Sequence, residues 1–267
     1  IGHLDVVPAG EGWLTDPFTL TEKDNKLIGR GTEDDKGALL LCLYALYALK
    51  CEKIKFNRKI RIIAGCNEET GWKDLEYLNK VTVLPKYGFS PDGDFPLSYA
   101  EKGVYIVTFY LPTLKNFCSL EGGTVINAVP AVAKAISKTT PISSLLEKHY
   151  LKYDGTHVVS IGKTAHGSAP QNGKNAFKNL FMYMSDCGEN LAELSEYLFN
   201  DKSKLGDLQT EQGTVTLSPN IIAKTENGYA LSADLRIPAP LSIEDVKPFL
   251  NKFGVSYDII EKHPPLI

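Results

Sequence analysis

The chain has 267 residues, of which 43% are hydrophobic and 23% charged, values typical of a folded globular protein. Its formal net charge of −3 gives no reason to expect nucleic acid or an anionic membrane as a partner. The sequence contains no run of about 18 apolar residues and no secretory leader pattern. The five cysteines are scattered without CxxC spacing, which argues against a disulfide framework or a thiolate zinc site and favours a reducing cytoplasm.

The first hundred residues predict alternating strands and helices. Residues 1–7 form a short apolar strand, 38–50 an almost wholly apolar helix buried against a sheet, and 59–66 a β-branched buried strand. This order favours an α/β fold with a mainly parallel sheet flanked by helices. Because a strand needs about five residues and His3 is already the third, we expect that residues precede Ile1 and that the chain is a fragment.

After residue 101 the pattern changes to that of a second, α+β unit over residues 102–258. Three segments are typical of strands and three are typical of helices. Residues 200–213 are typical of a loop. Ser242 and Asp245 have the spacing of a capping box at the start of the last helix. The expected strands are 104–111, 213–222 and 229–237, and the expected helices are 131–137, 175–185 and 242–253. Residues 259–267 are expected to return to the first domain.

Acidic side chains and one histidine recur at predicted strand ends and turns of the first unit. His3 and Asp5 are two residues apart, so on a strand they share a face. The pair Asp34-Asp35 lies in a glycine-flanked turn, and Glu68-Glu69 follows a strand, at the sheet edge where ligands bind in open α/β folds. In the turn SPDGDFP a further acid, Asp92, is found, and Trp13 and Trp72 flank these segments as possible pocket walls.

Each motif alone has a simpler structural interpretation. An HxD pair on a strand is most often a pair of ordinary polar side chains without a function, and a DD pair is most often a helix cap. An EE pair is most often a solvated strand end, and Asp92 alone is most simply a turn-forming residue. Their joint occurrence is harder to attribute to chance. Imidazole and carboxylate ligands without thiolate suit Zn²⁺, Mn²⁺ or Co²⁺, and a surplus carboxylate is what a metal-assisted hydrolase needs as general base.

The ordered motifs GHLDVVP, W…PF, GRGTEDDKG, NEETGW and SPDGDFP resemble those of the two-metal aminoacylase and dipeptidase superfamily. Within it the sequence is most similar to PepV-type dipeptidases, also called Xaa-His dipeptidases. The resemblance implies a zinc-peptidase-like catalytic domain over residues 1–101 with an inserted α+β lid over residues 102–258. It also implies two zinc ions per site, with Mn²⁺ or Co²⁺ as alternatives, and a monomer that cleaves dipeptides.

The resemblance also assigns roles to residues of the first unit. It implies that His3 and Asp92 bind the first metal, that Glu69 binds the second, and that Asp34 bridges both, with a cis peptide bond after it. The family's orienting aspartate matches Asp5, and its general base matches the remaining glutamate, Glu68.

In the lid, three motifs match family positions that contact substrate. GGTVINAVP contains Asn127, GKTAHGSAP contains His166, and ADLRIP contains Arg236, which matches the arginine that binds a substrate carboxylate. Without the family, these residues would be a turn asparagine, a structural histidine and a solvated strand arginine.

One departure from the family pattern concerns its last metal ligand, a histidine in a glycine-rich turn near the C-terminus. Nothing after Asp92 resembles that turn, so we expect the 267-residue chain by itself to bind one metal better than two and to be inactive or nearly so. Two other functions stay open: a deacylase of N-acyl amino acids with the same site, and a non-catalytic protein that retains the fold. A free substrate amine would distinguish the dipeptidase, with Asp92 or Asp94 as its acidic partner.

Overall fold

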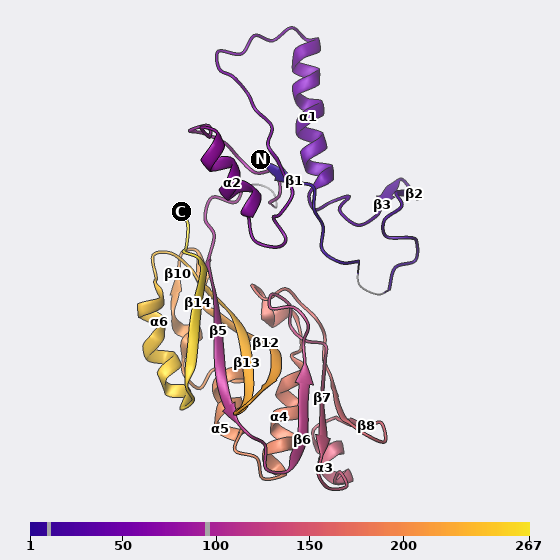
Figure 1. Cartoon of the computed structure of the whole chain (residues 1–267), viewed down its shortest axis with the longest axis vertical. Helices are drawn as coiled ribbons and strands as arrows, with labels where there is room; N and C mark the ends of the chain where they lie inside the picture. Colours follow the sequence, from indigo (N-terminus) through magenta and orange to yellow (C-terminus); the bar gives the residue numbers. More distant parts are fainter. Residues whose placement is uncertain (10–11, 94–96) are drawn as a thin grey trace. The chain divides into compact units, whose positions relative to one another are not determined.

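A computed structural model describes residues 1–9, 12–93 and 97–267, and within them the chain divides into two compact units, 1–98 and 99–267 (Figure 1). The mixed α/β class expected from the sequence is confirmed. No helix in the described ranges has the length and apolar character needed to cross a membrane.

Unit 1 contains short strands and two helices joined by long loops. Its elements are β1 (Gly2–His3), β2 (Thr21–Lys23), β3 (Lys26–Ile28), α1 (Lys36–Cys51), β4 (Ala64–Gly65) and α2 (Lys73–Val81). Strands β1 and β4 pair in parallel, so the chain segments that follow them leave the pair at the same edge. The strands predicted over 1–7 and 59–66 are therefore present but much shorter, with only two residues of each in the ladder.

Helix α1 forms where the sequence predicts it, but its predicted burial is wrong in the described structure. Leu39 is its one buried residue and packs beside Gly2 of β1, whereas most of the other leucines and both tyrosines of the helix are exposed. The reason is geometric: the two-residue strand β1 covers one turn of a 16-residue helix.

Unit 2 is built on an eight-stranded antiparallel sheet with the order β14-β5-β13-β12-β6-β7-β9-β8 (Figure 1). The strands are β5 (Gly103–Pro112), β6 (Phe117–Gly122), β7 (Val132–Ser137), β8 (Lys152–Tyr153), β9 (Val158–Ile161), β12 (Thr216–Thr225), β13 (Gly228–Ile237) and β14 (Tyr257–His263); β10 (Gln209–Thr210) and β11 (Gly213–Thr214) form a separate pair. The α-helices are α3 (Ser143–Lys148), α4 (Ala176–Asp186), α5 (Ala192–Phe199) and α6 (Ile243–Leu250), and 3₁₀ turns cover Pro170–Asn172, Leu205–Asp207 and Asn251–Phe253.

Most of the predicted elements of unit 2 are confirmed, including the capping box of Ser242 and Asp245 at the start of α6. The helix predicted over 131–137 is wrong, because this segment is strand β7, paired on both sides with β6 and β9. Ala133 and Ala135 are buried on one face of that strand, so the sheet overrides the helix propensity of alanine.

The two faces of strand β13 differ in chemistry, and this difference positions the lid residues. Its odd-numbered residues from Tyr229 to Ile237 are buried in an apolar core that also contains side chains of α4, α5 and α6. Because side chains alternate along a strand, the even-numbered residues Ser232, Asp234 and Arg236 lie on the other face. That face is polar, and it carries the candidate substrate-binding residue Arg236.

Candidate functional site

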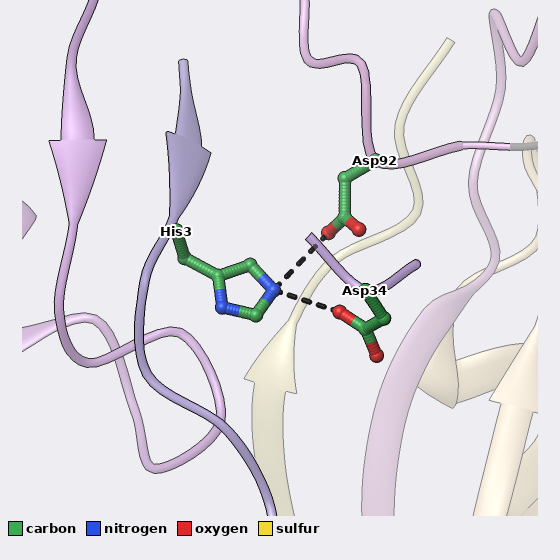
Figure 2. Close-up of side chains that lie close together, drawn as sticks. All are labelled: His3, Asp34 and Asp92. Carbon is green, nitrogen blue, oxygen red and sulfur yellow. Dashed lines mark hydrogen bonds and ion pairs between the residues drawn. The ribbon is translucent and has the colours of Figure 1, made fainter. Parts of the chain in front are cut away.

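In unit 1 the histidine of β1 lies among the carboxylates that the sequence singles out. His3 is only 2% exposed, and its Nε2 lies 2.9 Å from Oδ1 of Asp34 and 3.8 Å from Oδ2 of Asp92 (Figure 2). The ligand atoms of these three residues all lie within 4.8 Å of one another. Both carboxylates point toward the same ring nitrogen, which is the arrangement expected around a divalent cation (Figure 2).

A second group of possible ligands shares the same histidine. Atoms of His3, Glu68 and Glu69 also lie within 4.8 Å of one another, and both glutamates are half-buried. They follow β4 just as Asp5 follows β1, so the parallel pairing of the two strands brings them together. His3 therefore belongs to two groups of possible ligands, one with Asp34 and Asp92 and one with Glu68 and Glu69.

Asp5 connects the members of this cluster through hydrogen bonds. Its carboxylate accepts the backbone N–H of Glu68 at 3.2 Å and that of Glu69 at 3.1 Å. Its backbone carbonyl lies 2.9 Å from Nδ1 of His3, and one carboxylate oxygen lies 3.4 Å from the same nitrogen. A protonated Nδ1 that donates to this carbonyl leaves Nε2 free to bind a metal.

Asp35 is a residue of this cluster to which the sequence assigned no role of its own. Its peptide bond with Asp34 is cis, as the family resemblance implies, and its side chain is fully buried. Oδ2 accepts the backbone N–H of His3 at 3.0 Å, while Oδ1 has no hydrogen-bond partner among the described residues. Asp35 thus fixes the backbone of the histidine rather than capping α1 with its side chain. Only tertiary structure distinguishes the two adjacent acids.

The electrostatics of the cluster favour a cation. Burial lowers the pKa of His3, but the hydrogen bond with Asp34 and the surrounding negative charges outweigh it, so the pKa is raised. Burial and the charge of Glu69 raise the pKa of Glu68, and burial and the charge of Asp34 raise that of Glu69. Burial, followed by neighbouring aspartates, raises the pKa of Asp92. A bound divalent ion would offset the mutual repulsion of these carboxylates and so favour their ionised forms.

The surroundings of the cluster include one of the two predicted pocket walls. Trp72 lines a small pocket with His3, Glu68 and Asp92, whereas Trp13 lines a different pocket of unit 1. The sequence also named Asp94 as a possible partner for a substrate amine, and that residue lies outside the described residues.

In unit 2 the three predicted substrate residues gather on the polar side of the sheet. His166 forms a β-bridge with Ala128, the neighbour of Asn127, and the N–H of Gly167 donates to the carbonyl of Asn127 at 2.6 Å. A methyl group on Gly167 would lie 2.3 Å from Oδ2 of Asp234 on β13. The loops of Asn127 and His166 therefore contact each other and reach the strand that carries Arg236.

Two further residues of this cluster were not singled out by the sequence. Asp234 accepts two hydrogen bonds from Arg236, and the Nζ of Lys102 donates to the carbonyl of Thr214 at 2.6 Å. Burial, together with the positive charge of Arg236, lowers the pKa of Lys102. The signal for Asp234 was present in ADLRIP, because residues two apart on a strand share a face. For Lys102 the sequence contains no comparable signal.

A histidine–carboxylate cluster at the edge of a parallel strand pair defines a candidate metallohydrolase, and comparison with known families agrees. The chain belongs to peptidase family M20/M25/M40, whose profile matches residues 1–170. It is 31% identical to the Beta-Ala-Xaa dipeptidase of Lactobacillus delbrueckii subsp. lactis, over 97% of this chain and 62% of that protein. The chain thus spans less than two thirds of this relative's length.

Two solved structures are also similar to the chain. Human carnosine dipeptidase 1 is 19% identical with a TM-score of 0.46, covering 100% of this chain and 62% of that one. An M20 family metallo-carboxypeptidase from Sulfolobus solfataricus is 18% identical with a TM-score of 0.47, covering 99% and 64%.

Proposed function

We propose that the natural gene product hydrolyses the peptide bond of dipeptides with divalent metal ions bound at the His3 cluster. The observation that carries this proposal is the grouping of one buried imidazole with four carboxylates, each with an oxygen within 4.8 Å of a ring nitrogen. Membership of the M20/M25/M40 peptidase family and the similarity to a Beta-Ala-Xaa dipeptidase support the reaction class.

The donor set fits the metal that the family implies. One nitrogen and several carboxylate oxygens suit Zn²⁺, Mn²⁺ or Co²⁺, with zinc as our first choice, and the family resemblance implies two ions per site. His3 and Asp92 would hold one ion and Glu69 the other, with Asp34 shared between them. Bound ions would acidify a water molecule and polarise the peptide carbonyl.

The chain's own residues would carry out the proton transfers and bind the substrate. Glu68 would take a proton from the attacking water and deliver it to the leaving amine, a task helped by a carboxylate whose pKa is already raised. Asn127 and His166 would donate hydrogen bonds to the carbonyl oxygen as negative charge develops on it. Arg236 would bind the C-terminal carboxylate, for which its planar guanidinium is suited.

Several finer assignments are proposed with this function. The PepV-type specificity, the division into a catalytic domain over 1–101 and a lid over 102–258, and a monomeric state follow from the family resemblance. A cytoplasmic location fits the five cysteines, which are all free thiols in the described chain.

The test is a hydrolysis assay of the natural gene product, stripped with chelator and then supplied with Zn²⁺ or Mn²⁺. The substrates are simple dipeptides, β-alanyl-histidine and N-acetyl amino acids. We expect metal-dependent cleavage of dipeptides in preference to acetylated amino acids, and loss of that cleavage in Glu68→Gln. Preference for the acetylated substrates would instead identify the protein as a deacylase of N-acyl amino acids that uses the same site. Absence of turnover with either metal would refute the enzymatic function.

A further inference from the structure

A buried ion pair fixes the side chain of Arg236 on the polar face of unit 2. Arg236 donates from Nε to Oδ1 of Asp234 at 2.6 Å and from Nη2 to Oδ2 at 2.9 Å. The aspartate side chain is 3% exposed and the arginine side chain 15%. Two parallel charge-assisted hydrogen bonds hold a guanidinium in one plane and one direction, so the position of Arg236 is set by Asp234.

The ion pair occupies only one edge of the guanidinium. An arginine side chain carries five N–H donors, and the pair with Asp234 uses two of them. No other described residue hydrogen-bonds to the Arg236 side chain. The edge formed by Nη1 and Nη2 consequently retains donors in the parallel arrangement that matches a second carboxylate.

A second cation lies near the same edge of the sheet. Val104 of β5 pairs with Arg236, and Lys102 lies two residues before Val104, immediately N-terminal to the strand. Burial, followed by the positive charge of Arg236, lowers the pKa of Lys102, as expected of two neighbouring cations. Arg236, Lys102 and Asp234 together carry one net positive charge, which favours an anionic ligand.

Asp234 also contacts the loop that carries His166. A methyl group added to Gly167 would lie 2.3 Å from Oδ2 of Asp234 and 3.1 Å from the carbonyl oxygen of Asn127. Glycine at this position therefore allows the loop to rest directly against the carboxylate. One buried acid thus contacts Arg236 and the loop of His166, and that loop in turn contacts Asn127 through the N–H of Gly167.

We propose that Asp234 is a positioning residue that holds Arg236 with its Nη1–Nη2 edge free for the C-terminal carboxylate of a dipeptide, and that seats the His166 loop beside it. This proposal rests on the proposed dipeptidase function. It assigns Asp234 no contact with substrate, because its two oxygens are already engaged by Arg236.

The test compares kcat/KM of the natural gene product for a dipeptide and for the same dipeptide with a C-terminal amide. Asp234→Asn retains the shape of the side chain but replaces one acceptor by an NH₂ group that faces Nη2. Loss of a charged hydrogen bond predicts a fall of roughly 10- to 100-fold in the preference for the acid over the amide. The lost preference should come from a higher KM for the dipeptide with a free C-terminal carboxylate, while kcat/KM for the amide changes little. Arg236→Lys should lose the preference to a similar extent, and the double variant should lose little more.

Two more variants separate positioning from general stability. Gly167→Ala keeps every charge but pushes against Asp234, so it should lower the same preference even if Asp234→Asn fails to fold. Asp186→Asn is the matched control: this aspartate is also paired, with Lys148 and His149, and its loss should leave the preference unchanged.

The outcomes distinguish this proposal from the proposed function. If the wild-type protein cleaves neither substrate with any metal, the dipeptidase function and the positioning role both fail. If the wild type prefers the acid and Arg236→Lys loses that preference while Asp234→Asn and Gly167→Ala retain it, only the positioning role is refuted. An equal loss of activity toward acid and amide in Asp234→Asn would show a structural role and would also refute it.

Discussion

The replacement Asp5→Asn tests how the carboxylate cluster of unit 1 is held for metal binding. Asp5 accepts two backbone N–H groups, those of Glu68 and Glu69, and it approaches Nδ1 of His3. Asparagine has nearly the same shape but one acceptor oxygen fewer, and its NH₂ group would face a backbone N–H. The change therefore loosens both glutamates and the histidine without removing any atom that faces the metal.

The expected magnitude follows from these contacts. A hydrogen bond to a charged group contributes about 1.5–3 kcal/mol, and the lengths of 3.1 and 3.2 Å together with 20% exposure of the side chain favour the lower half of that range. Losing one such bond and the charge near His3 corresponds to about 2 kcal/mol. At about 1.4 kcal/mol per tenfold change, affinity for the metal should fall roughly 10- to 100-fold.

The assay is competition for Zn²⁺ against a chromophoric chelator, with circular dichroism to verify that the variant is folded. Asp16→Asn is a suitable control, because Asp16 also lies in unit 1 and accepts hydrogen bonds from the N–H of Phe18 and the hydroxyl of Thr19. The control should bind zinc as the wild type does. Wild-type zinc affinity in a folded Asp5→Asn protein would refute the idea that Asp5 organises the site.

Three further predictions concern catalysis, packing and pH. Glu68→Gln should lower kcat about 10²- to 10⁴-fold while zinc still binds in the chelator assay; loss of zinc instead would identify Glu68 as a ligand. Phe109→Ala should lower the free energy of unfolding by about 3–5 kcal/mol in urea titrations, since this ring is fully buried; a loss under 1 kcal/mol would contradict that. Hydrogen bonds from Lys148 and His149 lower the pKa of Asp186, so its contribution to stability is present above the unfolded pKa of about 3.9 and is lost as the pH falls through the lowered folded value. Between about pH 5 and about pH 2, the stability difference between wild type and Asp186→Asn should therefore decline only below about pH 4; a difference that grows as the pH falls through this interval would refute this.

Much of unit 2 could be predicted because its signals are local. The alternation over 104–111 and 229–237 and the capping box at Ser242 depend on neighbours in sequence, and the structure has strands and a helix there. The segment 131–137 shows where locality fails. AVAKAIS has both alanine-rich helix propensity and a two-residue alternation, and only pairing with β6 and β9 decides between them.

In unit 1 the proximity of the candidate residues was easier to predict than the architecture around them. The motifs predicted a cluster of His3, Asp34 and Asp92, and the structure places their ligand atoms within 4.8 Å of one another, because each lies at a strand end or a turn. The extent of the strands was overpredicted, because an apolar β-branched run shows that a segment can be buried, not that a partner strand is available along its whole length. The exposed leucines of α1 have the same explanation.

The aspartates of the two units fall into two kinds that sequence alone does not separate. Asp5, Asp35 and Asp234 are largely buried, and their oxygens accept hydrogen bonds from backbone N–H groups or from an arginine. In contrast, Asp34 has a side chain that is 65% exposed, and its oxygen points at Nε2 of His3. A carboxylate already engaged by the protein cannot also serve a ligand well, but it can fix the groups that do. Substitution of an aspartate of the first kind should therefore weaken metal or substrate binding by degrees, whereas substitution of Asp34 would remove a proposed metal ligand outright.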